Sequence, residues 1–175
     1  MRAMNDDLAR LLRDVPDFPK PGILFKDITP LLRNGEGFRM AVERLAAQLP
    51  SPLDAVLGIE ARGFIFGAAM AAHLGVGFVP ARKKAKLPAA VDRVSYALEY
   101  GEDCLEVHRG SFNPGDRVVI VDDVIATGGT ARAAVDLARL QGAEVVATAF
   151  VIELGFLEGR AKLPPEVPVL SLIQY

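Results

Sequence analysis

Tryptophan is absent from this chain of 175 residues, and it contains one cysteine and two histidines. Because Cys104 is the only cysteine, the chain cannot form an internal disulfide or a thiolate cluster around a metal. His73 and His108 stand far apart in the sequence and predict no metal site. These absences favour a reducing compartment, and we expect the protein in the cytoplasm.

The chain also lacks an excess of positive charge. Its 20 Lys and Arg residues are outnumbered by 22 Asp and Glu residues, which gives a formal net charge of -2. Proteins that bind a phosphate backbone ordinarily carry a basic face. We therefore expect no nucleic-acid partner.

No hydrophobic run is long enough to predict a membrane span. Residues 63–81 contain no Asp, Glu, Lys or Arg, but Gly75 and Gly77 interrupt them where a buried helix would end and a buried strand would begin. The N-terminal residues 1–15 carry both charge signs and lack the apolar core of a signal peptide. We expect neither a membrane protein nor an exported one.

What the chain does contain is the composition of a folded domain. Hydrophobic residues make up 51% of it and charged residues 24%, and its length suits a single domain over residues 1–175. Amphipathic helices are predicted over residues 5–15 and 37–49. The prolines of residues 16–30 exclude a continuous helix or a central strand there, so this segment must be an ordered loop or a cap.

From Asp54 onward, apolar runs alternate with helical patterns. The predicted strands cover residues 55–59, 77–81, 117–124, 143–154 and 167–175, and the predicted helices cover residues 63–74 and 130–142. This alternation predicts an α/β fold, an open and mainly parallel twisted sheet with helices on both faces. A polar stretch at about residues 83–107, with two short extended runs around Gly101, predicts a protruding hairpin or a mobile flap.

The most informative segment is VVIVDDVIATGGT, residues 118–130. A buried strand runs into Asp122 and Asp123, which would emerge at the edge of the sheet where open α/β folds bind ligands. Paired carboxylates there suit the hydroxyls of a ribose. The loop that follows consists of Ala126, Thr127, Gly128, Gly129 and Thr130. Its glycines let backbone N–H groups surround an anion, its threonines add hydroxyl donors, and the helix after it favours negative charge at its N-terminus.

Taken singly, the two acids could simply end a strand and the glycines make its turn. The segment has neither the Walker A nor the Rossmann spacing. As a whole it closely resembles the phosphoribosyl pyrophosphate signature of the type I phosphoribosyltransferases. That resemblance implies that Asp122 and Asp123 hold the ribose hydroxyls and that residues 126–130 hold the 5-phosphate. It also implies Mg²⁺, held mainly by substrate oxygens.

Nearly the whole chain resembles the adenine-specific branch of this family. The segment DFPKPGILFKDITPLL forms a hood over the base in that branch, and here the hood with its leading helix covers about residues 1–34. The resemblance implies that Phe25 stacks on adenine and that Leu154 packs on the other face of the base. It implies that backbone groups of Leu24 and Lys26 read the base edge, although many relatives have Arg where Lys26 stands.

Two further segments, IEARGFIFG and ARKKAKLPAA, resemble the pyrophosphate contacts of the family. The residues concerned are Arg62, Arg82, Lys83 and Lys86. Some of these contacts cross a dimer interface in relatives, so we expect a homodimer. Ala85 stands where relatives often have Gly.

Glu99 and Tyr100 match the flexible catalytic loop of the family. A loop that closes over the site would exclude water from the activated sugar. Glu99 is the candidate for handling the proton at N7 of the base. Without the resemblance, Glu99 would be interpreted as a solvated acid on a hairpin.

The implied reaction joins adenine to the ribose 5-phosphate of phosphoribosyl pyrophosphate and yields AMP and pyrophosphate. One alternative is transfer to another base, such as orotate or xanthine, and the hood sequence argues against it. Another is a regulator that senses phosphoribosyl pyrophosphate while it binds nucleic acid, which the acidic balance and the short N-terminal segment disfavour. A scaffold would need neither the acidic pair nor the glycine loop.

Overall fold

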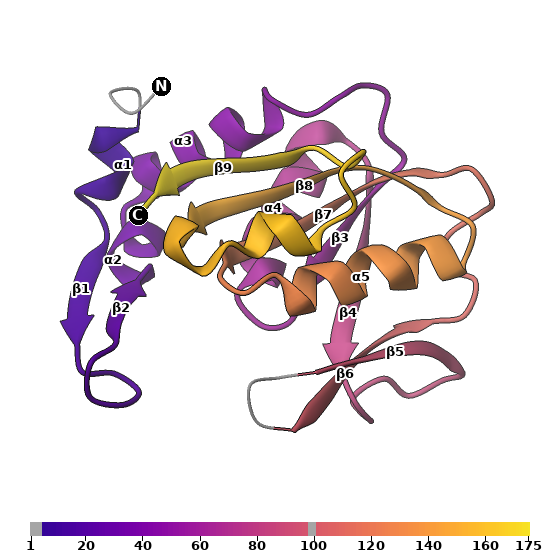
Figure 1. Cartoon of the computed structure of the whole chain (residues 1–175). Coiled ribbons are helices and arrows are strands. Elements are labelled where there is room, and N and C mark those ends of the chain that lie inside the picture. The colour runs from indigo at the N-terminus through magenta and orange to yellow at the C-terminus, as the bar shows by residue number, and fades with distance from the viewer. Residues whose placement is uncertain (1–4, 98–100) are drawn as a thin grey trace.

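The computed structural model describes residues 5–97 and 101–175 (Figure 1). Its centre is a sheet of 7 strands in the order β5-β6-β4-β3-β7-β8-β9. The strands are β3 (Ala55–Ile59), β4 (Gly77–Lys83), β5 (Val91–Ala97), β6 (Glu102–His108), β7 (Arg117–Ile125), β8 (Glu144–Glu153) and β9 (Val169–Gln174). The run from β4 to β9 in this order is parallel. Strand β6 pairs antiparallel with both β4 and β5.

Alternating side chains of the central strands bury both faces of the sheet. On β7, Val118 and Ile120 pack in the core that contains helix α5 (Gly129–Leu140), which crosses one face in Figure 1. Val119 and Val121 of the same strand pack in the opposite core, with helices α3 (Gly35–Ala46) and α4 (Gly63–Leu74). Because both faces are covered, the middle parts of these strands are mainly apolar. The predicted fold class is confirmed.

The βα alternation lies where the sequence pattern predicted it. Strand β3 and helix α4 match their predicted bounds, and α5 begins one residue before its predicted start. Helix α3 begins at Gly35 rather than Gly37 because the side chain of Asn34 accepts a hydrogen bond from the Gly37 N–H at 2.9 Å. Within residues 5–97 and 101–175, no helix has both the length and the apolar character that a membrane crossing requires.

The predicted helix over residues 5–15 is wrong beyond its first turn. Helix α1 covers only Asp6–Ala9, and the chain then forms strand β1 (Arg13–Pro16). Strand β1 pairs antiparallel with β2 (Leu24–Asp27), which places Arg13 opposite Asp27. Their side chains form an ion pair of 2.5 Å. This pairing with a distant segment overrides the local helical pattern, and the resulting hairpin leads into helix α2 (Thr29–Arg33).

Two short 3₁₀ turns, η2 (Gly155–Leu157) and η3 (Gly159–Lys162), connect β8 to β9. They lie beside the carboxyl ends of the parallel strands, on the same edge as the β1–β2 hairpin (Figure 1). The β5–β6 hairpin extends from the opposite side of the sheet, next to β4. The carboxyl ends of β3 and β7 lie between these two outlying parts.

Candidate active site

A cavity of about 320 Å³ opens at the carboxyl ends of β3 and β7. Ligands of open α/β sheets bind at this edge, because loops rather than helices follow the strands there. The cavity is lined by Glu60, Ala61, Arg62, Lys83 and all of residues 122–131. The structure thus brings together the predicted sugar and phosphate residues with two of the four predicted pyrophosphate residues.

The acidic pair lies inside β7, close to its end. The Asp122 Oδ1 atom accepts a hydrogen bond of 2.8 Å from the Asp123 N–H, and Asp123 forms an ion pair of 2.6 Å with Nε of Arg62. Burial raises the pKa of the Asp122 carboxyl well above its usual range, and the negative charge of Asp123 raises it further. A ligand that donates hydroxyl groups, or that brings a cation, would relieve this crowding of negative charge.

The glycine loop begins directly after β7 and leads into α5. Gly128 has a φ of 80°, in the left-handed region, and Gly129 is the first residue of the helix. A Cβ atom on Gly128 would lie 2.2 Å from the carbonyl oxygen of Gly159, so the loop packs directly on the η3 turn. The residues at the start of α5 line the cavity, and free N–H groups at a helix N-terminus can bind an anion.

Arg62 links the cavity to the hood. Its guanidinium lies 5.5 Å from the centre of the Phe25 ring, a distance typical of a cation–π contact. The Phe25 ring also packs edge-on against Phe18, with 5.2 Å between ring centres. The predicted base-stacking residue therefore lies next to the acidic pair, with Arg62 between them.

The other predicted base residues, Leu24, Lys26 and Leu154, are not among the residues that line the cavity. Lys26 directs its ammonium to Asp14 at 2.6 Å and over the ring of Tyr175 at 3.7 Å, which leaves its backbone as the part available to a base. The side chain of Leu24 is half-exposed. The Leu154 N–H donates to the carbonyl of Ile125 at 3.0 Å, which ties the turn after β8 to the end of β7.

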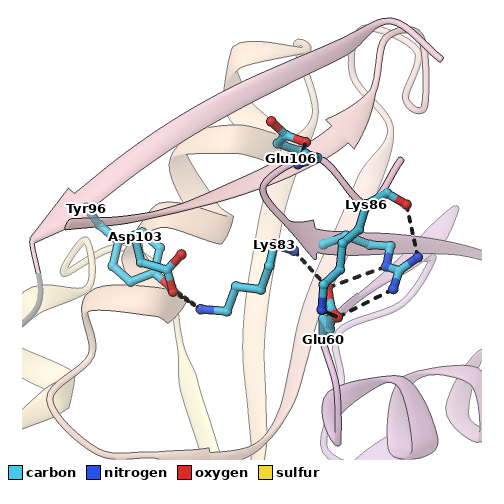
Figure 2. A network of polar contacts seen from close by, with 8 residues as sticks. Glu60, Lys83, Lys86, Tyr96, Asp103 and Glu106 are labelled. Atoms are coloured by element: carbon cyan, nitrogen blue, oxygen red, sulfur yellow. Dashed lines mark hydrogen bonds and ion pairs between the residues drawn. The ribbon is translucent and has the colours of Figure 1, made fainter. Parts of the chain in front are cut away.

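The four predicted pyrophosphate residues separate into two groups. Arg62 and Lys83 line the cavity, whereas the side chains of Arg82 and Lys86 turn to Glu60 (Figure 2). The Lys83 ammonium contacts Asp103 and donates to the Tyr96 hydroxyl at 2.8 Å. Lys83 therefore links β4 to the β5–β6 hairpin.

Sequence reasoning missed Glu60. Burial opposes its ionisation, but hydrogen bonds from Lys86, the Lys83 N–H and Arg82 outweigh this effect and lower its pKa to about 2. Glu60 precedes Ala61 and Arg62 at the end of β3, and its partners lie on the next strand and the loop after it. The available signal was an acid in the segment IEARG that precedes the basic cluster ARKKAK.

Sequence reasoning also missed Glu153, the last residue of β8. Its buried carboxylate accepts hydrogen bonds from Arg160 at 2.5 and 2.7 Å, from the Ser171 hydroxyl at 2.5 Å and from Gln174 at 3.1 Å. These contacts fix η3 and β9 to the end of β8, directly before Leu154. No motif distinguished this glutamate from other acids at strand ends.

Two predicted residues, Glu99 and Tyr100, lie outside the described residues. Within the described ranges, no three His, Cys, Asp or Glu side chains lie close enough together to hold a metal ion. A metal at this cavity would therefore need oxygen ligands from a bound substrate in addition to the carboxylates of Asp122 and Asp123.

Comparison with known proteins identifies the family. The family model described as "Phosphoribosyl transferase domain" matches residues 31–169, a range that includes strands β3 to β8 and every residue lining the cavity. The chain therefore belongs to the phosphoribosyltransferase family.

Within this family, the chain falls among the adenine phosphoribosyltransferases. It is 63% identical over 164 residues to the adenine phosphoribosyltransferase of Synechococcus sp. (strain JA-3-3Ab). The aligned region covers 93% of this chain and 94% of the relative. The crystal structure of the Rhodothermus marinus adenine phosphoribosyltransferase is 52% identical, with a TM-score of 0.93 and 97% of each chain covered. The Saccharomyces cerevisiae adenine phosphoribosyltransferase, complexed with an imino-altritol bisphosphate and adenine, is 40% identical with a TM-score of 0.93, over 98% of this chain and 99% of that one.

Proposed function

We propose that the protein transfers the 5-phosphoribosyl group of phosphoribosyl pyrophosphate to adenine, which yields AMP and pyrophosphate and salvages the purine. The observation that carries this proposal is the single cavity in which the acidic pair of β7 adjoins the glycine loop and the N-terminus of α5. A ribose bearing a 5-phosphate presents the matching groups at that spacing. The yeast relative, complexed with adenine and a sugar-like bisphosphate, supports the same assignment.

In this proposal the acidic pair and the glycine loop bind the sugar phosphate. Asp122 and Asp123 accept hydrogen bonds from the two ribose hydroxyls. The backbone N–H groups of residues 126–130 and the hydroxyls of Thr127 and Thr130 donate to the 5-phosphate. The reacting carbon is then held between the acidic pair and the hood.

The leaving pyrophosphate is proposed to meet cations. Arg62 and Lys83 contribute from the cavity wall, and Arg82 and Lys86 from the adjoining loop. Mg²⁺ fits as part of the substrate complex, because the two carboxylates of β7 offer the hard oxygen ligands it prefers but do not form a cage. When bound, Mg²⁺ would offset the charge that develops on the pyrophosphate.

The base is proposed to lie between Phe25 and Leu154, with backbone groups of Leu24 and Lys26 at its edge. An acceptor carbonyl that faces the amino group of adenine would face another acceptor if the base were hypoxanthine, and both polar groups would lose their partners. The hood therefore selects adenine over the oxo-purines. The orientation of the Lys26 side chain toward Asp14 and Tyr175 is compatible with recognition through its backbone.

Glu99 and Tyr100 are proposed to act from the loop between β5 and β6. Positive charge develops on the sugar as pyrophosphate leaves, and N9 of the base then attacks. Glu99 would hold the proton at N7 of the base, and closure of the loop would keep water from the activated sugar. We also propose that the protein works as a homodimer in the cytoplasm.

The test is release of pyrophosphate from phosphoribosyl pyrophosphate with Mg²⁺, with adenine, hypoxanthine, guanine, xanthine, orotate and uracil offered in parallel. We expect turnover with adenine alone, and none with the Asp123→Asn variant, whose shape is kept while the charge is lost. Turnover with another base would show that the assignment of Phe25 and Leu154 is wrong. If no base supports turnover, the proposed enzymatic activity is refuted and a role as a sensor of phosphoribosyl pyrophosphate is favoured.

A further inference from the structure

Glu60 makes a set of contacts that the proposed reaction does not use. Its Oε1 atom lies 2.5 Å from the Lys86 ammonium and 3.4 Å from Nη2 of Arg82. Its Oε2 atom accepts the Lys83 N–H at 2.8 Å and lies 3.4 Å from Nε of Arg82. Figure 2 shows the carboxylate enclosed by these donors, and only 9% of its side chain is exposed.

All three donor residues are among those proposed to bind pyrophosphate: Arg82 and Lys86 contact Glu60 through their charged side chains, and Lys83 through its backbone N–H. Carboxylate and phosphate oxygens are alternative acceptors for the same guanidinium and ammonium groups. The Arg82 guanidinium also donates to the Lys86 carbonyl at 3.1 Å, so the two cations are held together around Glu60. Neither of them lines the cavity, although Glu60 itself does. When an anionic ligand binds, Arg82 and Lys86 must either leave Glu60 or contact both Glu60 and the ligand.

We infer that Glu60 is an internal counter-anion, a positioning residue that competes with pyrophosphate for Arg82 and Lys86 and so limits how tightly pyrophosphate is held. The inference rests on the proposed function, which makes pyrophosphate the product. It holds whether the pyrophosphate lies in the cavity of the same chain or in that of a second copy, since the cations engage Glu60 in either case.

The advantage of this arrangement lies in product release. Pyrophosphate carries several negative charges, and a cluster of fully available cations would bind it strongly. Tight binding of product gains nothing for catalysis when it is not specific to the transition state. A buried carboxylate that takes back Arg82 and Lys86 lowers the affinity for pyrophosphate and speeds its departure.

The Glu60→Gln variant tests this inference. The amide keeps the shape of the side chain and an oxygen that accepts the Lys83 N–H, but it removes the negative charge. We expect magnesium pyrophosphate to bind about tenfold more tightly by titration calorimetry, a factor that corresponds to about 1.4 kcal/mol. The inhibition constant for pyrophosphate should fall by a similar factor. Slower release of pyrophosphate should lower kcat and KM for adenine together, so that kcat/KM for adenine stays unchanged. If Glu60 had a purely structural role, the variant would instead bind pyrophosphate more weakly and have a lower kcat/KM for adenine.

The chain offers a matched control in Glu106, another buried acid of the same network (Figure 2). Its side chain accepts the Ala85 N–H at 3.0 Å and pairs with Arg93 at 3.6 Å. Glu106 lies opposite Arg82 in the pairing of β4 with β6, but these side-chain contacts involve neither the Arg82 guanidinium nor the Lys86 ammonium. Glu106→Gln removes the same formal charge and should leave the affinity for pyrophosphate unchanged. If both variants bind pyrophosphate more tightly by the same factor, the change in net charge explains the effect and the role given to Glu60 is overturned.

Unchanged or weaker pyrophosphate binding in Glu60→Gln also overturns the inference. If that variant does not fold, Glu60→Asp replaces it, because the shortened carboxylate retreats from both cations and should tighten binding by a smaller factor; unchanged affinity there refutes the inference. The proposed function fails separately, when the unaltered protein does not turn over adenine. The calorimetric titration needs no turnover and therefore judges Glu60 in either event.

Discussion

Gly128 is the residue on which the conformation of the glycine loop depends most directly. Its φ of 80° lies in the left-handed region, which costs a residue with a Cβ atom about 1–2 kcal/mol. The added atom would also lie 2.2 Å from the carbonyl oxygen of Gly159, a backbone group that cannot rotate away. We predict that Gly128→Ala lowers the free energy of unfolding by about 2 kcal/mol or more and raises KM for phosphoribosyl pyrophosphate.

The neighbouring glycine supplies the comparison. Gly129 does not have a positive φ, and a Cβ atom there would meet its nearest neighbour, the carbonyl of Ala97, at 3.6 Å, an ordinary contact. Gly129→Ala should therefore change the free energy of unfolding by less than about 0.5 kcal/mol. Denaturant titration of the two variants checks this, and an equal loss in both would contradict the role given to Gly128.

At the scale of single residues, the sequence predicted which residues lie together at the cavity where the signal is local. The acidic pair and the glycine loop follow one another directly, so their order along the chain already predicts the cavity. Glu60 was missed because its partners lie on β4 and the loop after it, and nothing in the sequence specifies which acid meets which base. Ala85 adopts a φ of 62°, in the left-handed region that favours glycine.

At the scale of elements, the Glu153 network holds together three segments around the site. It joins the end of β8 to η3 and β9, and η3 in turn supports Gly128 through Gly159. Burial opposes ionisation of Glu153, but Arg160 and Ser171 outweigh it and lower its pKa. We predict that Glu153→Ala destabilises the protein by about 2 kcal/mol and raises KM for both substrates, because Leu154 and the glycine loop lose their common support.

An exposed ion pair serves as the control for this element-scale prediction. Arg39 and Glu43 lie one turn apart on α3, with side chains 59% and 40% exposed. Such pairs contribute little, so Glu43→Ala should cost less than about 0.5 kcal/mol. Thermal unfolding of the Glu153→Ala and Glu43→Ala variants compares the two losses of stability. If Glu153→Ala unfolds at the same temperature as Glu43→Ala, the network does not support the site.

The helices and strands were predictable from the sequence wherever burial imposes a regular spacing of apolar residues. Apart from His73, strand β3 and helix α4 consist of apolar or small residues, and glycines or charged residues mark their ends. The segment after α1 was not predictable in this way, because Arg13 and its neighbours have a helical pattern but pair with β2 instead. Sequence patterns describe the chain near each residue, whereas the β1–β2 hairpin depends on a partner more than ten positions away.

At the scale of the whole molecule, the orientation of the Arg82 and Lys86 side chains is relevant to whether two copies of the chain form the active site together. Both side chains engage Glu60 and neither lines the cavity of its own chain. Because the family resemblance implies that some of these cations serve the partner's site, we predict that activity depends on two copies. The variants Asp123→Asn and Arg82→Ala, each of low activity alone, should complement each other when their subunits are exchanged.

The expected yield follows from the symmetry of a dimer. Random exchange of equal amounts makes half of the dimers mixed, and each mixed dimer has one site in which an intact Asp123 meets an intact Arg82 from the other copy. About a quarter of the original activity should therefore return. If Arg82 instead serves its own cavity, every site in the mixture carries one defect and no activity returns. Mixing two samples of the same variant controls for any effect of the exchange itself, and a second pair built on Lys86→Ala asks whether both cations cross together.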